Sequence, residues 1–409
     1  MAKRILIITY CFPPINLPEA TLCAKALSGI NKDQFDVVTI GSKPSEHDNS
    51  FMKFVSNHFQ NVFRIRRSKI IEFFISLLLK KRSSLLKYPD SYIFYTPQLL
   101  ITLWKTDWSK YDRVITWSQW HSVHMSFWIW RFLSPKVTNL FWLAKFSDPW
   151  SDNQYNQFTP FQKKVNRLME QLIIRGANRL VFVTEETRSL YMDKYPPEWK
   201  SKSAVIPHCY SPELYSKQRH RSSKLLLRYL GSFYGERTPT SLFAAINDLK
   251  KIRPNLENEL ALEIFGNESP ELENWISKYN LKEIVNFKGH VSYIKSLKLM
   301  ASTDVLVSID APSDVNPFLS SKIIDYLGSK NPIIAVGSTK GATARLITKI
   351  GLVPLDFSDV NGMAKIISEY IAKKQNGGIT FTPPKNVIEQ YESSHVSQSY
   401  LKLLAANQE

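Results

Sequence analysis

The segment between residues 315 and 336 places a lysine and an aspartate at a predicted helix start. Its sequence, VNPFLSSKIIDYLGSKNPIIAV, predicts a loop, a helix beginning near Ser320 or Ser321, a turn and a buried strand. The first turn of a helix offers unpaired N–H groups and a partial positive charge, so Ser321 and Lys322 are suited to binding a diphosphate. Asp325 lies one turn deeper, where its carboxylate could accept hydrogen bonds from two ribose hydroxyls. A simple surface ion pair between Lys322 and Asp325 is the alternative.

A second cationic group follows a Gly-rich turn. In RYLGSFYGERTPT a predicted strand ends at Leu230, Gly231 and Ser232 open the turn, and Arg237 stands just before a helix. Glycine lets backbone N–H groups approach a phosphate, and the arginine fork can bind two of its oxygens. Because ligands bind at the carboxyl ends of parallel strands, we predict that Arg237 and Lys322 face one diphosphate and stabilise the charge that grows on it. The alternative is that Arg237 only covers the domain surface.

A carboxylate and two histidines follow strands in the first half. WLAKFSDPWSD places Asp148 at a strand end, where it could orient an acceptor hydroxyl or take its proton. Its alternative role is that of a turn carboxylate before Pro149. His121 and His124 are three residues apart, a spacing that two metal ligands could have. No further ligand accompanies them, so we predict no metal site.

Short apolar runs, each followed by a turn and a stretch of helical periodicity, recur along the chain. This alternation is typical of parallel sheets covered by helices, an α/β fold. The polar segment PHCYSPELYSKQRHRSSK interrupts it and predicts a linker, with a domain boundary near residue 210. We predict domains at 1–210 and 211–385, and a helical segment at 386–409 that closes the second domain or crosses to the first. The predicted strands are RILIIT, FDVVTI, RVITW, TNLFWLAKF, RLVFVT and SAVIP, then KLLLRYL, LALEIF, IVNFKG, DVLVSI, PIIAV and GLVPL.

The 315–336 segment resembles the donor-site motif of the retaining GT-B glycosyltransferases called family four. In that motif two glutamates eight positions apart precede a small-residue turn and a Pro-(Val/Ile)-Ile-Ala strand. Aligning the strand with PIIA puts Asp325 on the second glutamate, which holds the ribose, and Pro317 on the first, so this chain departs from the family there. Similar enzymes of surface-polysaccharide synthesis carry a comparable SK-helix-(D/E)YL version.

The resemblance implies a GT-B fold, in which two Rossmann-like domains face each other across a cleft and the C-terminal domain binds a nucleotide sugar. Phe265 and Gly266, after one strand, and His290 and Val291, after the next, would line the nucleotide base mainly through their backbone. Ordinary strand-to-helix turns are the alternative for both pairs. The family also implies retention of configuration, by front-face attack assisted by the leaving diphosphate, with no cofactor and no metal.

In the N-terminal domain the resemblance concerns three positions. The segment around Asp148 is similar to the (A)DFRDPW segment of a subset of these transferases. His124 aligns with a histidine for which an interdomain role is as fitting as catalysis. Asn16 lies in the first loop, which in the family meets the donor phosphates or the acceptor, and where Gly-Gly is common.

The net charge of +17 over 409 residues predicts an anionic partner. Basic residues surround the apolar run IIEFFISLLL between residues 64 and 87, which fits a segment lying on anionic lipid. A helix with its apolar side in the core is the alternative. Three scattered cysteines indicate neither disulfides nor zinc, and no run reaches the roughly 20 apolar residues of a membrane span.

Together these patterns predict a glycosyltransferase. We expect it to move a sugar from a nucleotide-sugar donor to a glycan or lipid-linked acceptor in surface polysaccharide synthesis. We expect it in the cytoplasm, peripheral on the inner face of the membrane. A GT-B nucleotide-sugar epimerase would share the fold and the donor pocket and is one alternative. A basic nucleic-acid-binding protein is another, although the chain contains no recognised nucleic-acid-binding motif.

Overall fold

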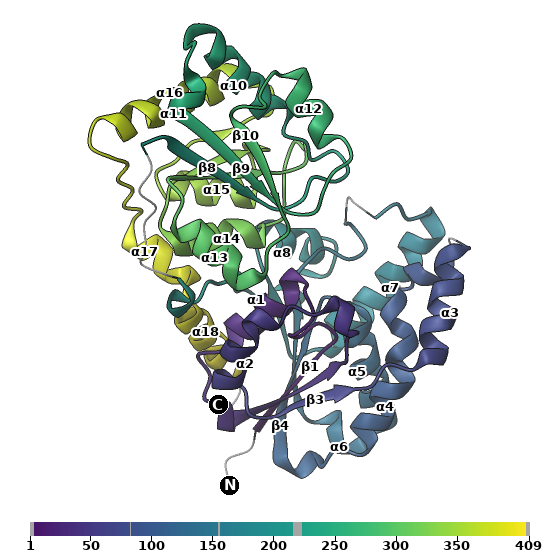
Figure 1. The fold of residues 1–409 in the computed structure, drawn as a ribbon. Helices are drawn as coiled ribbons and strands as arrows, with labels where there is room; N and C mark the ends of the chain where they lie inside the picture. Colours follow the sequence, from purple (N-terminus) through teal and green to yellow (C-terminus); the bar gives the residue numbers. More distant parts are fainter. Residues whose placement is uncertain (1–3, 82, 154–155, 216–222, 406–409) are drawn as a thin grey trace. The chain divides into compact units, whose positions relative to one another are not determined.

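The computed structural model describes residues 4–81, 83–153, 156–215 and 223–405. These residues form two compact units, one made of Met1–His208 with Ser393–Glu409 and the other of Cys209–Glu392. Part of the linker expected from the sequence, residues 216–222, lies outside the described residues. Each unit is a parallel sheet covered by helices, so the predicted α/β class with two Rossmann-like domains is confirmed (Figure 1).

The first unit contains a seven-stranded parallel sheet in the order β3-β2-β1-β4-β5-β6-β7. Strands β1 and β2 are buried along nearly their whole length because helices cover both faces of the sheet. Helices α1, α2 and α18 lie on one face, and α3 to α7 on the other (Figure 1). The strands are β1 Arg4–Thr9, β2 Phe35–Ile40, β3 Val62–Ile65, β4 Tyr111–Trp117, β5 Phe141–Phe146, β6 Arg179–Phe182 and β7 Ser203–Val205. The helices are α1 Pro18–Leu27, α2 Met52–His58, α3 Lys69–Lys80, α4 Thr96–Trp104, α5 Ser122–Leu133, α6 Pro135–Thr138, α7 Pro160–Gly176, α8 Glu185–Met192, α9 Pro197–Lys200 and α18 Ser393–Ala405.

Helix α18 belongs to the first unit although it comes last in the sequence. The Ser397 hydroxyl donates to the Ala26 carbonyl oxygen at 2.7 Å and accepts from the Gly29 N–H at 3.0 Å. The Tyr400 ring packs on Trp117, with ring centroids 5.2 Å apart. The final helix is therefore part of the first unit's core.

The second unit contains a six-stranded parallel sheet in the order β10-β9-β8-β11-β12-β13. Helices α10, α12 and α16 pack on one face, and α13, α14 and α15 on the other (Figure 1). The strands are β8 Leu225–Leu230, β9 Leu260–Phe265, β10 Val285–Gly289, β11 Val305–Ile309, β12 Ile333–Val336 and β13 Pro354–Leu355. The helices are α10 Thr240–Ile252, α11 Leu256–Glu259, α12 Leu272–Lys278, α13 Tyr293–Ala301, α14 Ser321–Ser329, α15 Ala342–Lys349, α16 Val360–Gln375 and α17 Lys385–Ile388.

Strand β3 is the one strand of the described residues that the sequence patterns missed. Its sequence VFRI is short and contains Arg64, and Phe63 is 52% exposed because β3 lies at the edge of the sheet. Among the described residues, none of the helices is both long enough and apolar enough to span a bilayer.

Candidate functional site

Each sheet has one place where the strand order reverses direction. In the first unit it lies between β1 and β4, and in the second between β8 and β11. At such a point the loops leaving the two strands turn to opposite faces, and ligands of α/β proteins bind in the crevice that opens there. These two places are therefore where a ligand is expected in each unit.

In the second unit Lys322 reaches the carboxyl end of β8. Its ammonium nitrogen lies 4.4 Å from the centroid of the Tyr229 ring and donates to the Tyr229 hydroxyl at 3.3 Å. A Cβ atom added at Gly231 would collide with this nitrogen, so the glycine makes room for the lysine. Burial and, to a smaller extent, the positive charge of Arg237 lower the pKa of Lys322 to about 7, while Asp310 opposes the change. The lysine is therefore poised to gain a proton when an anion arrives.

Arg237 is held by contacts on both sides of its guanidinium group. One nitrogen lies 3.5 Å from a carboxylate oxygen of Asp310, and another donates to the Tyr234 hydroxyl at 3.1 Å. Asp310 directly follows β11 and also accepts from the Asn316 amide at 3.3 Å. Arg237 thus contacts a buried carboxylate, and the charges of both groups act on the pKa of Lys322. The surplus positive charge suits an anionic ligand.

Asp325 and Lys322 have different partners in the structure. The Asp325 carboxylate accepts from the Tyr293 hydroxyl of α13 at 3.1 and 3.2 Å, and its backbone oxygen accepts from the Tyr215 hydroxyl at 2.9 Å. Lys322 instead contacts Tyr229. The surface ion pair considered from the sequence is wrong, because Asp325 is 6% exposed. The position before α14 that carries a glutamate in the resembled family holds the buried Pro317.

The turns after β8, β9 and β10 are joined through their backbone. The Gly231 N–H donates to the Phe265 oxygen at 2.7 Å, and the Gly266 N–H donates to the Gly289 oxygen at 3.1 Å. The Ser232 hydroxyl accepts a hydrogen bond from the Asn267 N–H of the next turn at 2.9 Å. Gly266 lies directly against the Gly231 backbone, so a side chain there would clash. These bonds fix the edge of the sheet on which the predicted base-binding residues stand.

Three further predicted donor-site residues flank this edge. His290 is exposed and Val291 half-buried, just after β10, and Ser321 begins α14. A small pocket at the carboxyl ends of β11 and β12 is lined in part by Asp310 and Asn316. The structure thus has polar groups around the whole carboxyl edge of β8 and β11.

In the first unit Asp148 follows β5. Its carboxylate accepts from the Gln119 amide at 3.3 Å, and its backbone oxygen accepts from the Tyr191 hydroxyl at 3.0 Å. Burial raises the pKa of Asp148 to about 6, the Glu19 carboxylate adds to the rise, and Lys145 opposes it. A carboxyl group that titrates near pH 6 can take or give a proton near neutral pH.

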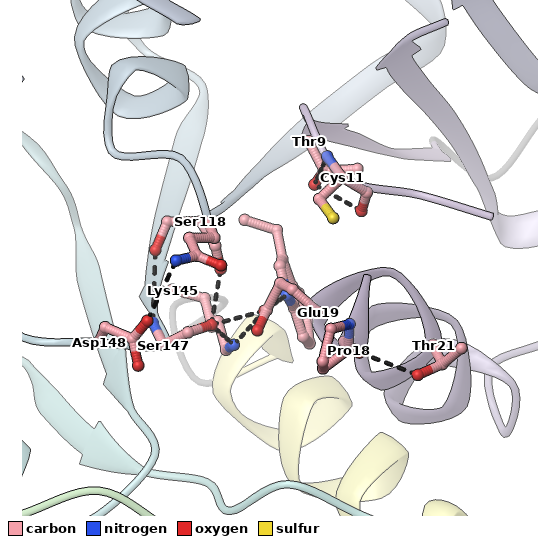
Figure 2. A network of polar contacts seen from close by, with 11 residues as sticks. Thr9, Cys11, Pro18, Glu19, Thr21, Ser118, Lys145, Ser147 and Asp148 are labelled. Carbon is pink, nitrogen blue, oxygen red and sulfur yellow. Dashed lines mark hydrogen bonds and ion pairs between the residues drawn. The ribbon is translucent and has the colours of Figure 1, made fainter. Parts of the chain in front are cut away.

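Beside Asp148 lies a buried polar network that the sequence patterns missed (Figure 2). One oxygen of Glu19 accepts from Lys145 at 2.7 Å, from Ser147 at 2.5 Å and from the Trp117 indole at 2.6 Å. A lysine inside the apolar strand FWLAKF was the available signal, since a charge buried in a strand needs a partner.

His124 and Asn16 lie in different environments. His124 is fully buried, its Nδ1 atom is 2.7 Å from the Thr116 hydroxyl, and burial lowers its pKa well below the usual range. These are the contacts of a neutral core histidine. Asn16 is exposed, and its N–H donates to the Glu46 oxygen at 2.8 Å. Their acceptor or interdomain roles stay predictions. Within the described residues no three His, Cys, Asp or Glu side chains are grouped to hold a metal ion.

Solved structures share this architecture along the full chain. HepE of Anabaena, solved in complex with UDP-glucose, matches with a TM-score of 0.63 at 13% identity, covering 99% of this chain and 100% of its own. Sucrose-phosphate synthase of Thermosynechococcus elongatus matches with a TM-score of 0.66 at 14% identity and the same coverage. The lipopolysaccharide outer core galactosyltransferase WaaB matches with a TM-score of 0.61 at 12% identity, covering 98% and 99%. No family model and no curated protein matches the sequence.

These matches define the class of fold. The chain has the GT-B fold, two Rossmann-like domains as found in retaining glycosyltransferases, and the fold expected from the 315–336 segment is confirmed. At 9–14% identity the likeness concerns the fold.

Proposed function

We propose that this protein is a glycosyltransferase that takes a sugar from a nucleotide-sugar donor bound by the second unit. The observation that carries the proposal is the surplus of cations at the carboxyl edge of β8 and β11. Arg237 contacts the carboxylate of Asp310 there, and Lys322, in the first turn of α14, contacts Tyr229 within the electrostatic influence of both groups. A diphosphate supplies the missing negative charge.

In this proposal each predicted donor residue has a separate task. Lys322 and Arg237 bind the diphosphate and stabilise the charge that develops on it as the bond to the sugar breaks. Asp325, held by the Tyr293 hydroxyl, accepts hydrogen bonds from the ribose. The turns bearing Gly231 and Ser232, Phe265 and Gly266, and His290 and Val291 approach the rest of the nucleotide, and Ser321 offers its N–H at the start of α14.

Asp148 of the first unit supplies the acceptor chemistry in the proposal. Its partial burial raises its pKa to about 6, so at neutral pH most of the carboxyl groups are ionised and able to accept a hydrogen bond or a proton from a hydroxyl. Sugar transfer to a hydroxyl releases that proton, so activity should rise with pH through about 6.

We further propose that the acceptor is glycan or lipid-linked and that α3 brings the protein to an anionic membrane surface. Five large apolar side chains of α3 are exposed: Ile70 81%, Phe73 71%, Phe74 44%, Leu77 38% and Leu79 59%. The first four recur at helical spacing along one side, whereas Leu78 is buried and Ile71 and Ile75 pack against the core. One apolar side of α3 therefore lies in the core, as the alternative expected, while a second apolar side is left exposed.

The basic residues around α3 differ in availability. Arg66, Lys69, Lys80 and Lys81 are exposed. Arg67 instead pairs with Glu46 at 3.1 Å and donates to the Gly41 oxygen at 2.6 Å, so it is committed to the fold. Arg82, also expected in this surface, lies outside the described residues.

Vesicle binding tests the membrane part. The triple variant Arg66→Gln, Lys80→Gln, Lys81→Gln should bind vesicles of phosphatidylglycerol and phosphatidylcholine more weakly, by roughly 1 kcal/mol per charge, and salt should weaken the parent's binding. Phe73→Ser should weaken binding at every salt concentration. Binding that neither salt nor these changes affect would refute the membrane surface.

Activity is tested with labelled nucleotide sugars, with and without lipid-linked acceptors. Transfer of label to an acceptor supports the proposal, whereas conversion of the donor to its epimer without acceptor would establish the epimerase alternative. Binding of labelled DNA or RNA, without either reaction, would favour the nucleic-acid-binding alternative. The Lys322→Ala variant must lose any activity found, or the activity does not come from this site.

A further inference from the structure

The network around Glu19 joins three segments that are far apart in the sequence. Glu19 stands in the first turn of α1, Trp117 and Ser118 end β4, and Lys145 and Ser147 lie at the end of β5. All these segments meet at the place where the strand order of the first sheet reverses. Figure 2 shows the Glu19 carboxylate joined by dashed lines to Lys145 and Ser147.

The hydrogen bonds of the network fix the ends of β4 and β5 to each other. The Ser118 N–H donates to the Lys145 oxygen at 3.0 Å, and the Ser147 N–H donates to the Ser118 hydroxyl at 3.3 Å. The Ser147 hydroxyl accepts from Lys145 and has its own proton for either Glu19 or the Ser118 oxygen, which lies 2.7 Å away. Glu19, Lys145, Ser147 and Ser118 are each at most 6% exposed.

This bracing continues directly into Asp148. Asp148 follows Ser147 in the chain, and its carboxylate accepts from Gln119, the neighbour of Ser118. The backbone of Asp148 therefore continues from Ser147, and its partner Gln119 continues from Ser118, and both of these serines are bonded into the network. Lys145 also lies 4.5 Å from the centroid of the Trp117 ring, which fixes its ammonium group against β4.

We propose that Glu19, acting with Lys145, is a positioning residue that sets the place and the charge environment of the Asp148 carboxylate. The inference deepens the proposed function, since it rests on Asp148 being the group that meets the acceptor. Glu19 and Lys145 have opposite charges and act on Asp148 in opposite directions. Their opposite charges compensate each other. Asp148 is therefore the group at this edge of the first sheet whose charge changes.

The thiol, phenol and imidazole groups packed around the network are neutral near pH 7. Burial raises the pKa of the Cys11 thiol and of the Tyr191 hydroxyl well above neutrality, and it lowers the pKa of His121, His124 and His208 well below it. Behind Tyr191, Glu170 and Asp152 are paired with Lys194. Lys25 of α1 is also buried, and its positive charge helps to lower the pKa of His208.

The inference predicts opposite effects of two variants on the titration of Asp148. Glu19→Gln removes a negative charge, so the pKa of Asp148 should fall by about 1, and Lys145→Met should raise it by about 1. The double variant removes both charges and should return the pKa close to about 6. A role in folding alone would not give shifts of opposite sign.

The experiment is a carbon-13 NMR titration of the full chain with labelled aspartate carboxyl groups. The Asp148 signal is assigned by its loss in Asp148→Asn. Asp107→Asn, at an exposed ion pair before β4, is the control and should leave the Asp148 titration unchanged. If a single variant fails to fold, the turnover of the double variant still decides, because that variant leaves no unpaired buried charge.

Kinetics of the double variant provide the second measurement. With the brace lost and the second unit untouched, kcat should fall by roughly tenfold while KM for the donor stays unchanged. Asp148 titrations that do not differ between the folded single variants, or a folded double variant with parent kcat, would overturn the inference. Shifts of opposite sign in a protein that transfers no sugar would support the positioning role and defeat only the proposed function.

Discussion

The two units treat a lysine at the carboxyl edge of their sheets in opposite ways. In the first, Lys145 meets Glu19 at 2.7 Å, and the pair is complete without a ligand. In the second, Lys322 has a tyrosine for a partner, a neighbouring arginine, and a pKa lowered to about 7. A buried charge with an opposite charge beside it therefore has a structural role, whereas an uncompensated charge at a strand end marks where a ligand is expected.

The largest difference between the two lysines should appear in stability. Glu19→Gln leaves Lys145 as an unpaired buried charge, so the free energy of unfolding should fall by about 3–5 kcal/mol. Lys322→Ala removes a charge that is already poorly solvated and should leave that free energy unchanged or slightly higher. Urea unfolding of each variant, followed by circular dichroism, measures both effects.

A matched variant separates the charge effect from packing. Glu19→Gln combined with Lys145→Met should be much more stable than Glu19→Gln alone, because no charge is left unpaired. Tryptophan fluorescence follows the first unit selectively, since Trp275 is the single tryptophan in the sequence of the second. Equal losses of stability for Glu19→Gln and Lys322→Ala would break the comparison.

The next largest effect should fall on turnover. Lys322→Ala and Arg237→Ala should each lower kcat roughly tenfold to more than a hundredfold, the loss of a hydrogen bond to a charged group. Asp325→Ala should instead weaken donor binding, because the ribose does not change during reaction. Lys251→Ala, at an exposed ion pair of α10, is the control. If all three site variants are folded and kinetically normal, the site is misplaced.

The depressed pKa of Lys322 predicts a pH dependence of donor binding. Below about pH 7 the lysine is already protonated and binding should be flat. Above it, the lysine must take up a proton to pair with the diphosphate, so the dissociation constant should rise toward tenfold per pH unit. Calorimetry in buffers of different ionisation enthalpy measures the proton uptake. Lys322→Arg should abolish it, and an unchanged profile in that variant would assign the dependence elsewhere.

The smallest expected effect concerns Gly231. Alanine there would push the ammonium group of Lys322 away, which costs little folding energy because a lysine end is flexible. Donor binding should weaken about two- to fivefold, less than one hydrogen bond to a charged group. In the Lys322→Ala background the same change should have no effect, and an undiminished loss there would show that Gly231 acts independently.

The fold was predictable from the sequence because nearly every strand is an apolar run ended by a turn. Strand β3 was missed because half of its residues face water at a sheet edge. Lys322, Arg237 and Asp148 were predictable as site candidates because each follows a strand or begins a helix, where parallel sheets bind ligands. Their surroundings were not: Lys145 meets Glu19 across 126 positions of sequence. Local patterns do not encode such pairing, and neither do they encode the burial that lowers the pKa of Lys322.

The return of α18 to the first unit has a consequence for the order of folding. Ribosomes release a chain from its N-terminus, and domains generally fold as they emerge. The first unit emerges first, yet Ser397 and Tyr400, which fill its core beside Ala26 and Trp117, are made only after the whole second unit. During synthesis the second unit is therefore the first to have its complete sequence. Until α18 is made, the face of the first unit on which α18 packs stays uncovered.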